Sequence, residues 1–184
     1  MTAAFINSFI LFFVAIDTIG NVPFFLSLTE DIKIKERNNI AIKATIIAFF
    51  ILITFAYGGK YLLEAINVSL DSLKIAGGII LMLLAIDILF EKRKRRREKR
   101  VEEALDEKSY EEIVVFPIAI PFIAGPSALT TIILLIGNYK NFPEFQITVI
   151  IALIAALIVG LVLMVGASHI INLFQNKYCM LLPE

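Results

Sequence analysis

Polar and helix-breaking residues interrupt two strongly apolar stretches of this sequence. The first stretch reads DTIGNVPFFLSLT at residues 17–29, and the second reads FPIAIPFIAGPSALTT at residues 116–131. A proline removes a backbone donor and excludes the carbonyl partner four residues back, so each stretch should contain a broken helix. In lipid, freed backbone groups are tolerated where protein or a watery cavity covers them. The two stretches therefore predict a polar site inside a membrane protein.

We expect this site to be a substrate-binding or translocation path built from both stretches. Its candidate residues are Asp17, Thr18, Gly20, Asn21, Pro23, Pro121, Gly125, Pro126, Ser127 and Thr130, with Thr131 nearby. A proline suits the first turn of a helix, so Pro23 and Pro126 could each open a second half-helix. The free N–H groups and the positive dipole end of such a half-helix would attract an anionic group.

Asp17 is the one charged residue among these candidates. An acid inside a membrane span is costly, and it marks a functional site by default. Burial of the acid makes a proton-coupled or cation-coupled step chemically feasible. The alternative is an acid that caps or bonds a neighbouring helix.

The surrounding sequence predicts the membrane helices that would position these residues. Hydrophobic residues make up 59% of the 184 residues, and the mean hydropathy is +0.85. Spans of roughly 17 to 25 apolar residues cross a bilayer as helices. Five candidate spans are present, at residues 3–28, 40–64, 72–90, 113–137 and 145–172. We therefore expect an all-α fold, a polytopic transmembrane helical bundle.

The two interrupted stretches also indicate an internal repeat. Alignment of Gly20 with Gly125 gives an offset that carries residues 40–64 onto the fifth span. Because a repeat of three spans is odd, its second copy would cross the membrane upside down, as in transporters with inverted repeats. The expected organisation is a first repeat, a charged cytoplasmic loop, a second repeat of two helices and an atypical tail, at residues 1–90, 91–112, 113–174 and 175–184.

Basic residues predict the orientation of the bundle. Four of the 17 Lys and Arg residues lie at 33–43, and nine lie at 92–108. Both connections should face the cytoplasm, which leaves the N-terminus outside. The segment 91–112 is either a solvated loop or a contact with anionic lipid head groups. Its acidic second half argues against nucleic acid as a partner.

Catalytic and metal-binding motifs are missing from the sequence. Cys179 and His169 are the only residues of their types, so they form no disulfide, metal cluster or catalytic dyad. We find no nucleophile elbow, no HExxH and no phosphate-binding glycine loop. We therefore expect no enzyme activity and no cofactor.

Three ordered motifs resemble the MarC family of bacterial and archaeal inner-membrane proteins, over roughly residues 1–174. They are DTIGNVPFFLSLT, LKIAGGIILMLLAIDIL and FPIAIPFIAGPSALTTIILL. The family pattern D-P-x-G-N-x-P falls on Asp17, Gly20, Asn21 and Pro23, with Thr18 where proline is usual. Its pattern P-x-x-x-G-P falls on Pro121, Gly125 and Pro126. The family is similar in architecture to LysE-type exporters, which move amino acids and other small solutes out of cells.

The resemblance implies six helices with both termini outside, whereas five spans are present here. A fragment or frameshift that removes the last helix is one explanation. The other is a genuine five-span protein whose second repeat is completed by a partner subunit. We interpret the chain as a multi-pass inner-membrane protein in contact with lipid, which exports an unidentified small solute, with proton coupling as one option. A non-transporting assembly or sensor subunit is the alternative, and a homo-oligomer is also open.

Overall fold

The computed structural model describes residues 1–30, 32–89, 110–139 and 141–181, and every regular element in these ranges is helical. The elements are α1 (Thr2–Ala15), α2 (Asn21–Leu28), α3 (Ile34–Ala65), α4 (Leu70–Leu89), α6 (Tyr110–Ile113), η1 (Val114–Ile123), α7 (Pro126–Asn138) and α8 (Pro143–Leu181). Helix occupies each of the five expected spans, which confirms the all-α bundle. The loop expected at residues 91–112 lies outside the described residues, except for its last three.

Two of the expected spans are split into half-helices. Residues 16–20 separate α1 from α2, and we call them the first break. Residues 124–125 separate η1 from α7, and we call them the second break. The axes of η1 and α7 are bent by 57° relative to each other. Both interruptions predicted from the sequence are therefore real breaks in the helices.

Apolar length identifies the segments that can cross a membrane. Among the described residues, α3 and residues 143–170 of α8 are each long and apolar enough, and the bent η1–α7 pair adds a third candidate. The helix α1 is apolar but only 14 residues long, because the first break ends it. The helix α4 covers all but the last residue of the expected span at 72–90.

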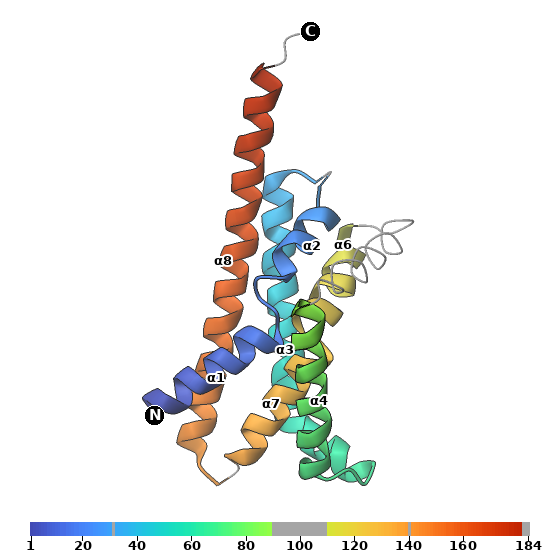
Figure 1. Cartoon of the computed structure of the whole chain (residues 1–184), viewed down its shortest axis with the longest axis vertical. Helices are drawn as coiled ribbons and strands as arrows, with labels where there is room; N and C mark the ends of the chain where they lie inside the picture. The colour runs from blue at the N-terminus through green and yellow to red at the C-terminus, as the bar shows by residue number, and fades with distance from the viewer. Residues whose placement is uncertain (31, 90–109, 140, 182–184) are drawn as a thin grey trace.

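The long helices α3 and α8 run beside each other along the molecule (Figure 1). The short helix α1 crosses α8 near the N-terminal part of that helix, and α4 packs against α7. The α2–α3 connection and the end of α8 lie at the top of Figure 1, whereas the N-terminus and the α7–α8 connection lie towards the bottom. Successive long helices therefore alternate in direction.

Small buried residues allow the helices to approach closely. Ala152, Ala156 and Gly160 recur every four residues on α8 and are buried. A matching row on α3, also buried, consists of Ala41, Ala44, Ala48 and Ala56. Small side chains on facing surfaces let backbones pack near each other, which brings the two breaks close to both long helices.

Arg37 closes the α2–α3 connection from the first turn of α3. Its Nη2 donates to the carbonyl oxygens of Thr29 at 2.6 Å and Glu30 at 3.0 Å. The side chain is only 5% exposed. A cation suits the carbonyl groups that follow a helix C-terminus, here that of α2. Arg37 therefore has an internal role, beyond the contribution to orientation that its position in the sequence predicted.

Candidate functional site

Asn21, the first residue of α2, connects the two breaks. Its Nδ2 donates to the carbonyl oxygen of Ile16 at 2.7 Å and to that of Phe122 at 2.8 Å. The first bond stays within the first break, and the second reaches the end of η1. Both partners accept, which fixes the nitrogen and oxygen of the amide in this orientation. The two donors of Asn21 are therefore fully used by carbonyl groups at the breaks.

Ser127, the second residue of α7, makes the return connection. Its Oγ donates to the carbonyl oxygen of Ala15 at 2.6 Å, and Ala15 is the last residue of α1. The last carbonyls of a helix lack partners within that helix, and lipid supplies none. Asn21 of α2 thus satisfies a carbonyl at the end of η1, and Ser127 of α7 satisfies a carbonyl at the end of α1.

Local backbone chemistry explains where the second break falls. Phe116 and Ile120 have extended dihedral angles, and each precedes a cis-proline, Pro117 or Pro121. Proline disfavours helical backbone in the residue before it, so η1 is irregular at both points. Gly125 caps α7, and a Cβ there would lie 2.6 Å from the carbonyl oxygen of Pro121. Glycine is therefore required by this close backbone approach.

The first break has a different local cause. Asp17 adopts φ of 53°, a left-handed conformation in which Asp and Asn are enriched among non-glycine residues. Gly20 caps α2, and a Cβ added to it would overlap the Asp17 carboxylate. Gly20 and Gly125, the pair aligned by the repeat, therefore both occupy the residue before a second half-helix. The inverted repeat as a whole stays a prediction.

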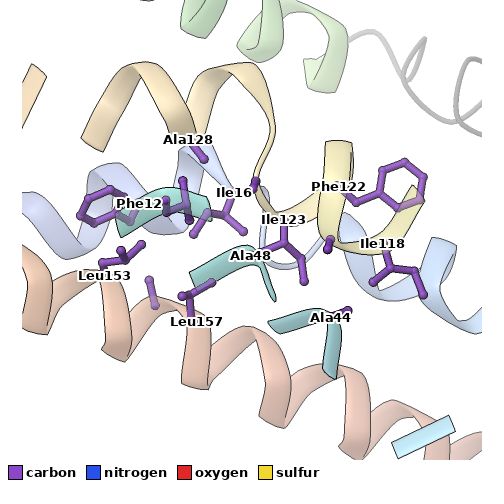
Figure 2. Close-up of a cluster of buried hydrophobic side chains, with 14 of the residues drawn as sticks. Phe12, Ile16, Ala44, Ala48, Ile118, Phe122, Ile123, Ala128, Leu153 and Leu157 are labelled. Atoms are coloured by element: carbon purple, nitrogen blue, oxygen red, sulfur yellow. The ribbon is translucent and has the colours of Figure 1, made fainter. Parts of the chain in front are cut away.

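A small buried pocket lies where the breaks meet α3 and α8. We call it the central pocket, and its lining residues are Ile16, Thr18, Asn21, Thr45, Ile123, Ala156, Leu157, Gly160 and Met164. Its volume is about 10 Å³, which is close to the minimum for one water molecule. Figure 2 shows Ile16, Ile123 and Leu157 within one cluster of buried side chains. The pocket is thus a single-occupant site in an apolar surrounding.

Three polar side chains face this pocket, and their donors are already engaged. The Thr18 hydroxyl donates to the carbonyl oxygen of Phe13 at 3.2 Å, and the Thr45 hydroxyl donates to that of Ala41 at 2.8 Å. Asn21 Oδ1 is buried with no hydrogen-bond partner. The polar lining therefore offers acceptor oxygens, which suits a hydrogen-bond donor or a cation. An anionic group, expected from the half-helix N-termini, does not match the chemistry of this pocket.

Asp17 does not line the central pocket. It is half-buried in the first break, and its carboxylate lies over Gly20 at the start of α2. An acid near a helix N-terminus is electrostatically favourable, so the capping alternative fits this placement. Its role in a translocation path stays a prediction.

The other predicted residues do not line the pocket. Pro126 opens α7, as expected, whereas Pro23 is the third residue of α2 because that helix already begins at Asn21. Both prolines are exposed, and Pro121 is half-buried at the end of η1. Thr130 faces α4, where its methyl group would meet a Cβ added to Gly77. Of the ten candidates, Thr18 and Asn21 line the central pocket.

Thr45 is the polar pocket residue that the sequence analysis missed. It follows Ala41 by four residues and precedes Ala48 by three, so it shares the buried face of α3. The row of alanines was the signal that could have identified it. Among the described residues, no three His, Cys, Asp or Glu side chains gather into a metal-binding group.

Comparisons with known proteins find similar membrane proteins over most of the chain. A family model described as MarC family integral membrane protein matches residues 2–182. A UPF0056 membrane protein of Archaeoglobus fulgidus is 42% identical over 90% of this chain and 74% of its own length. The UPF0056 inner membrane protein YhgN of Escherichia coli is 28% identical over 97% of this chain and 82% of its own. No solved structure matches the chain.

Proposed function

Because the chain belongs to the MarC family of integral membrane proteins, and is therefore embedded in a membrane, we propose that it exports a small solute through the site between its broken helices. The proposal places the protein in the cell inner membrane, with lipid and the solute as its partners. It assigns no enzymatic reaction and no cofactor.

The reciprocal hydrogen bonds between the breaks are the observation that carries this proposal. Asn21 reaches Phe122, and Ser127 reaches Ala15, across segments separated by more than one hundred residues. Discontinuous helices that meet near the middle of the membrane form the substrate and ion sites of many transporters. Two side-chain bonds are also few enough to break and re-form as one half moves against the other.

The orientation in the proposal has the N-terminus outside and the basic connections inside. Lys33 lies in the connection between α2 and α3 and Lys35 in the first turn of α3, and this end of α3 is opposite the N-terminus (Figure 1). Positively charged connections usually face the cytoplasm. Cysteine accessibility from outside whole cells tests this topology at the N-terminus and at the α2–α3 connection.

A transport assay with Asp17→Asn tests the proposed function. Solutes inside and outside cells are compared with and without the protein, and the identified solute is then followed. Asparagine tolerates the positive φ at this position, so the backbone should persist. We expect at least a tenfold loss of export with normal membrane insertion, because the amide keeps the polarity of the acid but loses its negative charge and its exchangeable proton. The exposed Glu144→Gln variant is the matched control and should export normally.

Normal export by Asp17→Asn would refute the assignment of this acid to the path. If no solute moves and the variant is tolerated, a stable partner that purifies with the protein would favour the alternative function. That alternative is an assembly or sensor subunit that does not transport.

A further inference from the structure

We infer that the central pocket binds one small monovalent cation, either an inorganic ion such as sodium or the ammonium end of a solute. The inference deepens the proposed function, and it rests on that function only for the use of the ion in transport. Four observations on the pocket support it.

The first observation is the unpartnered oxygen of Asn21. The side chain is 95% buried, since its exposed fraction is 5%, and Oδ1 has no hydrogen-bond partner. Native structures seldom leave a buried polar atom unsatisfied, because its lost hydration is costly. Both Nδ2 donors are held by carbonyl groups, so rotation of the amide cannot hide the oxygen without breaking them. An electropositive occupant of the pocket would supply a partner for this oxygen.

The second observation is the state of the two threonine hydroxyls. The Thr18 hydroxyl donates its one hydrogen to the carbonyl oxygen of Phe13, and the Thr45 hydroxyl donates its one hydrogen to that of Ala41. Each hydroxyl oxygen keeps lone pairs that can accept or coordinate. Three residues with neutral side-chain oxygens, from three segments of the chain, thus line one small space. Neutral oxygens are suitable ligands for hard cations.

The third observation is the direction of the half-helices. Ile16 follows the end of α1, and Ile123 is the last residue of η1, and both line the pocket. The C-terminal end of a helix carries partial negative charge. Such half-helix ends coordinate cations in transporters with broken helices. Asn21 also brings the N-terminus of α2 to the pocket, but an anion would still meet the lone pairs of the side-chain oxygens there.

The fourth observation concerns size and charge. A pocket of about 10 Å³ accepts an occupant close to one water molecule in size. No carboxylate is present among the residues that line it. Divalent cations in proteins are usually bound by carboxylates, so a monovalent ion fits the neutral oxygens better.

Thermal unfolding of the full chain in detergent tests the binding. The melting temperature is measured in sodium, methylammonium and N-methyl-D-glucamine chloride at equal ionic strength. We expect a saturable rise of roughly 5 to 10 °C at a hundredfold excess over Kd. A rise with sodium identifies an inorganic ion, and a rise with methylammonium identifies the ammonium end of a solute. Equal melting temperatures in all three salts would overturn the inference.

Two threonines of α3 provide a matched pair of variants. Thr45 and Thr54 each donate to a carbonyl four residues back at 2.8 Å, but Thr45 lines the pocket and Thr54 is exposed. Thr45→Val should weaken ion binding at least tenfold, whereas Thr54→Val should leave it unchanged. Thr45→Ser restores the oxygen and should restore binding. Equal ion responses of Thr45→Val and wild type would overturn the inference.

Gly160→Ala gives a second test in case Thr45→Val does not fold. A Cβ at Gly160 would lie 3.4 Å from the Thr18 methyl group, with nothing else within 4 Å, so the alanine fits. It should reduce the pocket volume without removing a polar group. We expect a folded protein whose melting temperature responds less to the ion. A full response would place the ion elsewhere and overturn the inference.

The melting-temperature and export assays test ion binding and transport separately. Loss of the ion response with intact solute export would refute the cation site alone. An intact ion response without any export would refute the proposed function alone.

Discussion

The two breaks reach similar geometry through different chemistry. The first break and the start of α2 contain Asp17, Thr18 and Asn21, and the last two are polar residues that line the central pocket. The second break follows two cis-prolines, and on this side only the apolar Ile123, at the end of η1, lines that pocket. The polar groups proposed to bind a ligand therefore lie at the first break, whereas the region of the second break contributes backbone shape and the hydrogen bond from Ser127 to Ala15.

The two breaks are therefore held in shape in different ways. A backbone fixed by proline and a close glycine contact keeps its shape without help from polar side chains. A backbone turned by polar residues depends on their hydrogen bonds, and those bonds can exchange with a ligand. We therefore expect substitutions in the first break to affect binding and stability together, and those in the second to affect mainly stability.

Asn21→Ala should have the largest effect on stability. It removes both Nδ2 bonds and leaves the carbonyl oxygens of Ile16 and Phe122 without those partners. We expect the free energy of unfolding to fall by about 2–4 kcal/mol, from two lost bonds to buried acceptors. Chemical unfolding in detergent measures it. Asn39→Ala, at an exposed position of α3, is the control, and equal losses in both variants would contradict this role.

Gly125→Ala should rank second. The added Cβ would lie 2.6 Å from a backbone oxygen, that of Pro121, which cannot move cheaply. We expect a loss of about 1–3 kcal/mol, as for other overpacked sites. Gly20→Ala should cost less, because the Asp17 side chain that it meets can rotate away. Unfolding curves of both variants test this order.

Gly58→Ala is the control for both glycine variants. Nothing lies within 4 Å of a Cβ at Gly58, which is in the middle of α3. Alanine is favoured over glycine inside a helix, so stability should rise by up to about 1 kcal/mol. If Gly20→Ala costs more than Gly125→Ala, the first break is the more rigid one, and the division proposed above is reversed.

Ser127→Ala should have a smaller effect than either change. It removes one bond, to the carbonyl oxygen of Ala15. Hydrogen bonds between membrane helices contribute about 0.6 kcal/mol on average and up to about 1.7, so we expect a loss of about 1 kcal/mol. Ser27→Ala, exposed on α2, should change stability little. A loss as large as that of Asn21→Ala would show that both breaks depend equally on polar side chains.

Much of the fold could be predicted from the sequence for a simple physical reason. Long apolar segments in lipid must be helical, and prolines with glycine mark where such helices break. These arguments correctly placed helix in the five expected segments and both breaks between helices. They also placed Gly20 and Gly125 before the second half-helices.

The hydrogen-bond partners of the polar side chains could not be predicted from the sequence. The bond from Asn21 to Phe122 joins residues 101 positions apart, and its acceptor is a backbone carbonyl that any residue would supply. Thr45 and Thr54 look alike in the sequence, and only the buried face of α3 distinguishes them. For the same reason, the presence of Pro23 after Gly20 could not show that this proline lies two residues inside its helix.

Substitutions of Pro126 and Pro23 should have the smallest effects on the free energy of unfolding, and the two effects should differ in sign. Pro126 follows Gly125, whose extended ψ of 171° is the conformation that a following proline favours. Pro126→Ala should therefore cost about 0.4–1 kcal/mol, since the unfolded chain gains freedom. Pro23 instead follows Val22, which is already helical, a conformation that proline disfavours. Pro23→Ala should be neutral or slightly stabilising in the same unfolding assay, and a larger loss than that of Pro126→Ala would contradict this.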